Sequence, residues 1–374
     1  MDDVVVAGGG PAGAFAALLL ARAGLKVRVF DRARFPRPKL CGDTLNPGAL
    51  SVLRRHADTA ALLTRSDPIH GMRLTGPGGV RVDGLYGDGI AGRSITRAAL
   101  DQWLLERATD AGAQVEEQAA VRDVMTIDGR VAGIVVGARR RTHRARLVIA
   151  ADGRRSAIAI GRGLSHQPRR PRRWAIGSYF TDVSDMTSLG EMHVRRDHYI
   201  GVAPVPGGLT NVCLVMPIAG ADRRLVNPLE VLLQAVRADP ELAPRFAGAR
   251  AVEAPVVLGP MAVDARVAGE PGLLLAGDAA GFIDPMTGDG LRFALAGAEL
   301  AAGVIRDVLS GAVPIGQAHE LLGDRRRDAF QAKWRFNRAL RSLVASPASV
   351  SAAALTAKVL PAAFSRMIQY AGDC

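Results

Sequence analysis

Lysine, cysteine, aromatic residues and long apolar runs are all scarce in this chain of 374 residues. The three cysteines, Cys41, Cys213 and Cys374, show no paired spacing, which argues against a disulfide framework and a cysteine-based zinc site. No apolar run approaches the roughly 18–20 residues that span a bilayer, and the acidic N-terminus lacks the basic segment of a signal peptide. With no spacing of histidines and carboxylates typical of a metal site either, we expect a cytoplasmic protein without a metal.

Basic charge is abundant, but it comes almost entirely from arginine. The net charge is +12, and lysine supplies only Lys26, Lys39, Lys333 and Lys358. The arginine clusters at 139–146, 169–173 and 325–327 are not interleaved with aromatic residues. We therefore expect solvated basic faces and no nucleic-acid partner. Peripheral contact with an anionic membrane surface, or attraction of an anionic carrier or cofactor, is the alternative.

The N-terminus has the pattern of a dinucleotide-binding unit. An apolar run at 3–7 leads into Gly8-x-Gly10-x-x-Gly13, a helix is predicted over 12–23, and a second apolar run at 25–30 ends in Asp31. The glycines allow a tight turn, close approach of a pyrophosphate and close packing of the helix on the strand. Asp31 falls where a carboxylate accepts hydrogen bonds from a ribose. This pattern predicts an adenine dinucleotide site.

The rest of the chain indicates a second sheet inserted into an α/β domain. A helix is predicted over 97–111 with Thr96 as its N-cap, then a hairpin over 115–136, and a buried strand that ends at Asp152. Alternating segments between 171 and 257 predict an antiparallel sheet, and helices are predicted over 228–238 and 291–309. The predicted segments are an FAD-binding domain with inserted hairpin elements at 1–165, an antiparallel substrate domain at 166–258, a return to the first domain at 259–312 and a helical region at 313–374.

Three separated motifs resemble one family. The Gly8–Gly13 turn with Asp31, the Asp152-Gly153 pair and the sequence GDAAGFIDPMTGDG at 277–290 are similar to those of FAD-dependent oxidoreductases of the para-hydroxybenzoate hydroxylase-like superfamily. The resemblance covers about residues 1–345 and implies a Rossmann-like domain that binds FAD. The residues expected at FAD are Gly8, Gly10, Pro11, Ala12, Gly13, Asp31, Arg32, Cys41, Gly42, Arg97, Asp152, Gly277, Asp278, Pro285, Gly288, Asp289, Gly290 and Leu291.

The motifs do not all point to the same branch of the superfamily. The segment at 37–50 (RPKLCGDTLNPGAL) and the motif at 277–290 are most similar to the geranylgeranyl and menaquinone reductase group. That group carries a Tyr-x-Trp-x-Phe-Pro segment, but Gly201 and Ala203 replace the Trp and Phe here. We therefore expect an NAD(P)H-dependent monooxygenase that acts on a hydrophobic ring or polyketide, free or bound to a carrier. The alternatives are a reductase that saturates an isoprenoid double bond, a flavin halogenase, or an FAD-binding protein without turnover. The oligomeric expectation is a monomer or a homodimer.

No side chain stands out as catalytic, and the candidates are Cys41, Asp43, His193 and Tyr199. Cys41 and Gly42 are expected to serve as small residues beside the flavin ring, with Asp43 or Thr44 polar toward substrate. A nearby cation, Lys39, would lower the pKa of a nucleophilic thiol. The alternation at Glu191, His193 and Arg195 is expected to form a solvated strand face, with a pocket-lining role as the alternative.

Overall fold

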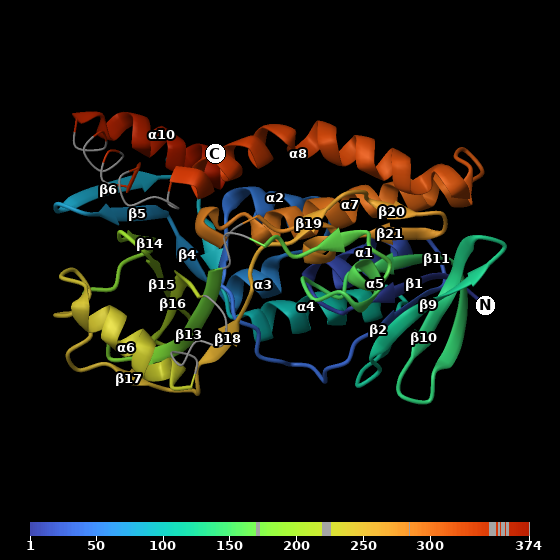
Figure 1. The fold of residues 1–374 in the computed structure, drawn as a ribbon, viewed down its shortest axis with the longest axis horizontal. Coiled ribbons are helices and arrows are strands. Elements are labelled where there is room, and N and C mark those ends of the chain that lie inside the picture. Colours follow the sequence, from blue (N-terminus) through green and yellow to red (C-terminus); the bar gives the residue numbers. More distant parts are fainter. Residues whose placement is uncertain are drawn as a thin grey trace.

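The computed structural model describes residues 1–169, 173–218, 226–283, 285–343, 349–350, 352, 356 and 359–373. Two sheet-centred lobes lie side by side (Figure 1). The first lobe contains the N-terminal strand and the second contains the antiparallel strands of the middle of the chain. The long helix α8 (Ala318–Leu343) runs along the first lobe toward the second.

The first sheet is mainly parallel, in the order β20-β21-β11-β1-β2-β8. The antiparallel hairpin of β9 and β10 continues from β11. The strands are β1 (Asp2–Ala7), β2 (Val27–Phe30), β8 (Gln114–Glu116), β9 (Val121–Ile127), β10 (Arg130–Val136), β11 (Arg141–Ala150), β20 (Gly269–Glu270) and β21 (Leu273–Leu275). Central strands of this kind are covered on both faces, which explains their continuous apolar sequences.

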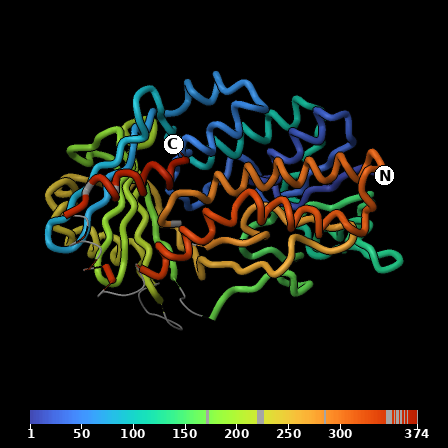
Figure 2. The backbone as a smooth tube through the Cα atoms, turned by 90° about the horizontal axis from the view of Figure 1, so that it is seen from above, coloured from blue at the N-terminus to red at the C-terminus, as the bar shows by residue number. Residues whose placement is uncertain are grey.

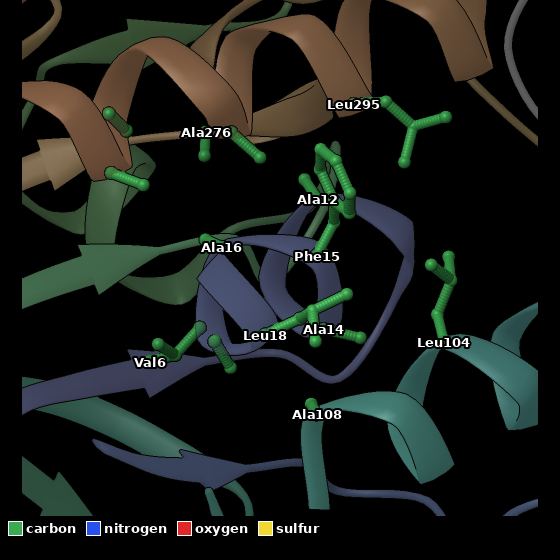
Figure 3. Close-up of a cluster of buried hydrophobic side chains, with 14 of the residues drawn as sticks. Val6, Ala12, Ala14, Phe15, Ala16, Leu18, Leu104, Ala108, Ala276 and Leu295 are labelled. Carbon is green, nitrogen blue, oxygen red and sulfur yellow. The ribbon is translucent and has the colours of Figure 1, made fainter. Parts of the chain in front are cut away.

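Alternate residues of β1 pack into two different cores. Val4 and Val6 face α1 (Pro11–Arg22), α4 (Arg97–Asp110) and α7 (Gly290–Leu309), whereas Val5 and Ala7 face the β9–β10 hairpin and α5 (Ala157–Gly161). In Figure 3, Phe15 of α1 lies among side chains that include Leu104 of α4 and Leu295 of α7. This packing fixes the N-terminus of α1 at the carboxyl edge of β1, where a dinucleotide binds in such sheets.

The second sheet has the order β17-β13-β16-β15-β14-β5-β6, with β18 also paired to β13. Its strands are β5 (Gly71–Gly76), β6 (Val80–Leu85), β13 (Arg173–Thr181), β14 (Leu189–Val194), β15 (Tyr199–Val205), β16 (Leu209–Pro217), β17 (Arg250–Ala251) and β18 (Val256–Leu258). One face packs on α6 (Pro228–Ala238), and Asn227 caps that helix by accepting from the backbone N–H of Glu230. The opposite face turns toward the first lobe.

Shorter elements complete the chain. The small strands are β3 (Thr44–Leu45), β4 (Asp67–Ile69), β7 (Gly92–Ser94), β12 (Ser165–His166) and β19 (Asp264–Ala265). The remaining helices are α2 (Pro47–His56), α3 (Ala60–Thr64) and α10 (Pro361–Gly372), and the 3-10 turns are η2 (Gly277–Ala280), η3 (Pro285–Thr287) and η4 (Ile315–Gln317). Figure 2 shows α7 and α8 in orange side by side and α10 in red beside β5 and β6.

Two sequence expectations need correction. The hairpin begins at Val121, because residues 114–116 form β8 and pair in parallel with β2. The boundary at 165 does not separate the two sheets, since β5 and β6 precede it and belong to the second sheet through the parallel pairing of β5 with β14. Within the described residues, no helix combines the length and hydrophobicity needed to cross a bilayer.

Candidate functional site

A cavity of about 840 Å³ lies between the two lobes. It runs from the turn before α1, past residues 37–44 and the η2 turn, to the inner face of β14, β15 and β16. Its volume falls in the usual range of small-molecule and cofactor sites, about 300–1,000 Å³. The polar residues gather at the first lobe and the apolar ones at the second sheet, so the two ends of the cavity offer different chemistry.

The turn before α1 packs its backbone so closely that side chains are excluded at two of its glycines. A Cβ on Gly13 would lie 1.8 Å from the carbonyl oxygen of Gly8, and Gly8 itself has φ +101°. Gly10, the N-cap of α1, offers no side-chain cap, so the first N–H groups of the helix are left for another acceptor. Pro11 and Ala12 line the cavity at this point. A helix N-terminus in this setting binds phosphate groups.

Asp31 is held beside the glycine turn in the same cavity. Its Oδ2 accepts a hydrogen bond from the backbone N–H of Gly9 at 2.7 Å, and its Oδ1 accepts one from the N–H of Ala33 at 2.8 Å. Each carboxylate oxygen can accept another bond. Asp31 and Arg32 both line the cavity, in the place where the sequence pattern expects a ribose.

Positive charge without a carboxylate partner lines the middle of the cavity. Within the described residues, neither Lys39 nor Arg154 forms an ion pair with a carboxylate. Burial lowers the pKa of Lys39 to about 8 and that of Arg154 to about 10. Buried cations of this kind, which the charge of Asp278 compensates only in part, are costly and favour an anionic ligand. The donor set, the glycine turn and Asp31 together fit the pyrophosphate and ribose of FAD.

Only some residues of the motif at 277–290 line this cavity. Gly277, Asp278, Gly288, Gly290 and Leu291 line the cavity, and the last two begin α7. The helix N-terminus therefore points its free N–H groups at the place where the flavin would sit. The side chain of Pro285 lies outside the described part of the chain.

Asp289 is placed differently from the expectation. Its buried carboxylate accepts hydrogen bonds from Asn46 and Asn337, both at 3.2 Å, and lies 3.7 Å from the ammonium of Lys333. It is not among the described residues that line the large cavity. The sequence pattern missed this because the three partners come from distant segments. Asp289 thus joins α8 to the start of α7.

Arg97 lies at the cavity, but its guanidinium is already paired. It donates two hydrogen bonds of 2.8 Å to the buried carboxylate of Asp101, which Arg37 approaches to 3.3 Å. Asp152 also lines the cavity. One of its oxygens accepts from the N–H of Ala157, the other is buried without a partner in the described structure, and burial raises its pKa.

Of the two residues expected to be polar toward substrate, Thr44 lines the cavity and Asp43 does not. The side chain is fully buried, with φ +54°, and accepts hydrogen bonds at 2.5 Å from both the Tyr179 hydroxyl and the Asn211 amide. A third bond comes from the backbone N–H of Arg97 at 3.1 Å. Burial raises the pKa of Asp43 to about 6, although these bonds favour the carboxylate, and it also raises the pKa of Tyr179. Asp43 therefore lies beneath the cavity floor.

The floor itself is formed by Cys41, Gly42 and Thr44. The backbone carbonyl of Cys41 accepts from Asn211 at 2.9 Å, which ties the floor to β16. Burial raises the pKa of the Cys41 thiol, which argues against the alternative of a nucleophile activated by Lys39. A Cβ on Gly42 would meet only the Thr44 hydroxyl, at 3.9 Å, so the space above it is open to a ligand.

Glu191, His193 and Arg195 are not a solvated face. Glu191 and His193 are each 1% exposed. Glu191 accepts two hydrogen bonds from Arg245, at 2.7 and 3.0 Å, while His193 lies between Glu191 and Thr75, 2.9 Å from each. Burial alone would raise the pKa of Glu191, but His193 and Arg245 lower it to about 2.

This cluster pairs Glu191 and His193 of β14 with each other and with Arg245, and Glu191 also lines the large cavity. His193 is absent from the described cavity lining, as is Tyr199, a buried residue whose ring lies 5.9 Å from the guanidinium of Arg173. Of the four catalytic candidates, only Cys41 reaches the cavity. Sequence analysis missed Arg154, Tyr179 and Asn211, because no local pattern marks them and only the fold brings them to residues 39–43.

Comparison with known proteins agrees with this geometry. The family model described as "FAD binding domain" matches residues 1–315. "Digeranylgeranylglycerophospholipid reductase 2" of Methanopyrus kandleri is 31% identical over 319 residues, 82% of this chain and 77% of the relative. "Menaquinone reductase" of Mycolicibacterium smegmatis is 31% identical over 80% of this chain and 75% of its own length.

Solved structures share the fold. A geranylgeranyl bacteriochlorophyll reductase-like protein from Thermoplasma acidophilum has a TM-score of 0.79 and 24% identity, over 93% of this chain and 89% of that one. The myxobacterial chondrochloren halogenase has a TM-score of 0.82 and 22% identity, over 90% and 81%. The family match and the reductase relatives, together with the glycine turn, Asp31 and Asp278, settle the family. The chain is a member of the FAD-dependent oxidoreductases of the para-hydroxybenzoate hydroxylase-like superfamily, with its relatives in the geranylgeranyl and menaquinone reductase group.

Proposed function

We propose that this protein reduces a carbon–carbon double bond in a hydrophobic substrate that carries a long apolar chain. The observation that carries the proposal is a second, apolar cavity of about 130 Å³ beside the large one. It lies between β5, β6 and β14 on one side and α8 and α10 on the other. Its walls include Leu74, Val80, Phe336, Leu340 and Ile368.

Three methionines separate the two cavities. Met72, Met192 and Met286 line both of them. Methionine is unbranched and flexible, so its side chain yields to a ligand at little cost. A chain-bearing substrate could therefore place its reactive end over the floor of Cys41 and Gly42 while its tail passes the methionines. The reductase relatives, whose names specify lipid and quinone substrates, support the same substrate class.

FAD, when bound and reduced by NAD(P)H, would supply the hydride. The protein would orient the double bond and exclude water from the large cavity. Lys39, Arg154 and the N-terminus of α1 would hold the pyrophosphate, and the N-terminus of α7 would stabilise negative charge on the reduced ring.

A monooxygenase that acts on a ring is the second candidate, and one observation favours it. Gly201 and Ala203 line the large cavity where the reductase group carries Trp and Phe. A Cβ on Gly201 would meet only the carbonyl of Cys213 and the end of Met192, each at 3.9 Å. The wider space would accept a ring beside the flavin.

Product analysis under nitrogen and in air separates these functions. The FAD-loaded protein would be reduced with NAD(P)H and given a geranylgeranyl lipid or menaquinone. If the protein is a reductase, its product carries two more hydrogen atoms than the substrate, and it forms without oxygen. A monooxygenase forms no product under nitrogen and adds one oxygen atom in air, and that result would refute the reductase proposal.

Leu340→Trp tests the tail cavity, because Leu340 lines only the apolar cavity. We expect this substitution to raise the KM of long-chain substrates more than that of truncated ones, and to leave FAD binding unchanged. Leu340→Met is the matched control, which should behave like the wild type because it conserves volume. Equal effects on long and short substrates would remove the tail cavity from the proposal.

A further inference from the structure

A third cavity, of about 350 Å³, lies behind the η2 turn. Its walls are the loop at 277–283, the inner side of α7 and the face of α8 that carries Arg326, Phe330 and Trp334. The two cavities adjoin along the same motif and share the lining residues Gly277, Asp278, Phe282, Gly290 and Ala294. We call it the α7–α8 cavity. Neither the FAD site nor the tail cavity uses Arg326.

Arg326 lines the α7–α8 cavity with hydrogen-bonding capacity left over. Its Nη2 donates to the carbonyl oxygen of Ala280 at 2.7 Å. Its Nε is buried and has no acceptor among the described residues. The side chain is half-buried overall, and no carboxylate of the described structure lies within ion-pair distance of it. A buried guanidinium donor without an acceptor is costly, and an anion would relieve that cost.

The space in front of Arg326 is kept open by a glycine in the middle of a helix. Gly297 is buried in α7, and a Cβ at this position would have no atom within 4 Å. Glycine inside a helix is less stable than alanine by about 1 kcal/mol, so the chain leaves this cavity unfilled at a cost in stability. An aromatic wall is formed by Phe293, Phe330 and Trp334. The ring centroid of Phe330 lies 5.2 Å from that of Phe293 and 5.7 Å from that of Trp334.

Three carboxylates also line the α7–α8 cavity, but each interacts with another group or is exposed to solvent. Asp289 is paired with Lys333 and two asparagines, Asp278 interacts with Lys39 across the turn, and Asp264 is exposed to solvent. Arg338, an exposed arginine of α8, adds positive charge at the rim. The positive side of the cavity is therefore the α8 wall, next to the aromatic rings.

We propose that the α7–α8 cavity binds a small aromatic molecule that carries a carboxylate or a phosphate. The anion accepts hydrogen bonds from Arg326, and the ring packs against Trp334 and Phe293. Because Arg326 also holds Ala280 in the η2 turn, this ligand stabilises the turn that presents Asp278 to the large cavity. Ligand binding and FAD binding then strengthen each other, and by linkage the effect is reciprocal. The proposal needs FAD binding but not a particular reaction.

Calorimetric titration of the FAD-loaded protein tests the site, with benzoate and phenyl phosphate as probes and benzamide as a neutral comparison. We expect at least one anionic probe to bind, and benzamide to bind about tenfold more weakly or worse. Arg326→Gln should lose the preference for the anion. Arg335→Gln, an exposed arginine of α8 outside the cavity, should bind like the wild type.

Gly297→Leu keeps the test valid if Arg326→Gln folds poorly. It fills the cavity and leaves the bond from Arg326 to Ala280 in place, so FAD content and Tm should be retained while probe binding is lost. In the wild type, a saturating probe should tighten FAD binding to the apoprotein, measured by flavin fluorescence. Absence of binding by both anions, or equal binding to wild type and Gly297→Leu, would overturn the proposal.

Discussion

Replacing Asp43 with asparagine would test the electrostatics beneath the flavin cavity. The Asp43 carboxylate is fully buried and accepts hydrogen bonds from Tyr179, Asn211 and the backbone of Arg97. Burial opposes the charged form more strongly than these bonds favour it, and it raises the pKa from 3.8 to about 6. The folded protein therefore binds this proton more tightly than the unfolded chain does.

The magnitude follows from the two pKa values. Their difference is about 2 pH units, which at 1.36 kcal/mol each corresponds to about 3 kcal/mol of folding free energy. Because the folded-state pKa is raised, this stabilisation is complete below about pH 4 and is lost as the pH rises through 6. The free energy of unfolding of the wild type minus that of Asp43→Asn should therefore fall by about 2.4 kcal/mol between pH 4 and pH 7, most of this total.

Urea unfolding of the FAD-saturated proteins across this range, followed by tryptophan fluorescence, measures the difference directly. Asp88→Asn, at an exposed loop position, is the control and should change stability by less than about 0.5 kcal/mol at each pH. A difference that stays constant, or that grows with pH, would show that Asp43 ionises in the folded state at least as easily as in the unfolded one. The account of the cavity floor would then be wrong.

Other parts of the structure make equally direct predictions. Lys39→Met should weaken FAD binding about tenfold or more. In the wild type the affinity for FAD should fall as Lys39 loses its charge above about pH 8, and this fall should be absent from the variant. Fluorescence titrations at several pH values measure both effects. Gly13→Ala should prevent FAD binding, because its Cβ would lie 1.8 Å from a backbone oxygen, and a normal flavin spectrum would contradict this. Glu191→Gln should cost about 3–5 kcal/mol in urea unfolding by leaving Arg245 without its carboxylate partner, whereas Glu230→Gln, at a half-buried position with a weaker ion pair, should cost little.

Local patterns predicted most of the first lobe and much of the second. The helix over 97–111 is observed at Arg97–Asp110, and Thr96 accepts from the backbone N–H of Ala99 as an N-cap. The helices at 228–238 and 290–309 were likewise predicted within a residue or two. These signals are short-range, since capping and helical periodicity involve residues within a few positions of each other.

The polar residues of the second sheet show where such patterns fail. The alternation of Glu191 and His193 indicates one strand face, but alternation alone does not say whether that face meets solvent or another segment. Arg245 and Thr75 come from distant parts of the chain and bury the pair. The same limit applies to the segment at 37–50, where Asp43 turned inward to Tyr179 and Asn211.

The sequence by itself predicted an FAD site, because the glycine turn and Asp31 are needed by the cofactor at fixed places in a βαβ unit, and Asp278 follows a later strand of the same sheet. Only the tertiary structure decided what surrounds that site. The methionines between the two cavities, the buried Asp43 and the buried Nε of Arg326, which has no acceptor among the described residues, depend on contacts between segments far apart in the chain. Their burial, and hence their charge and hydrogen bonding, exist only once the two lobes and α8 have packed together.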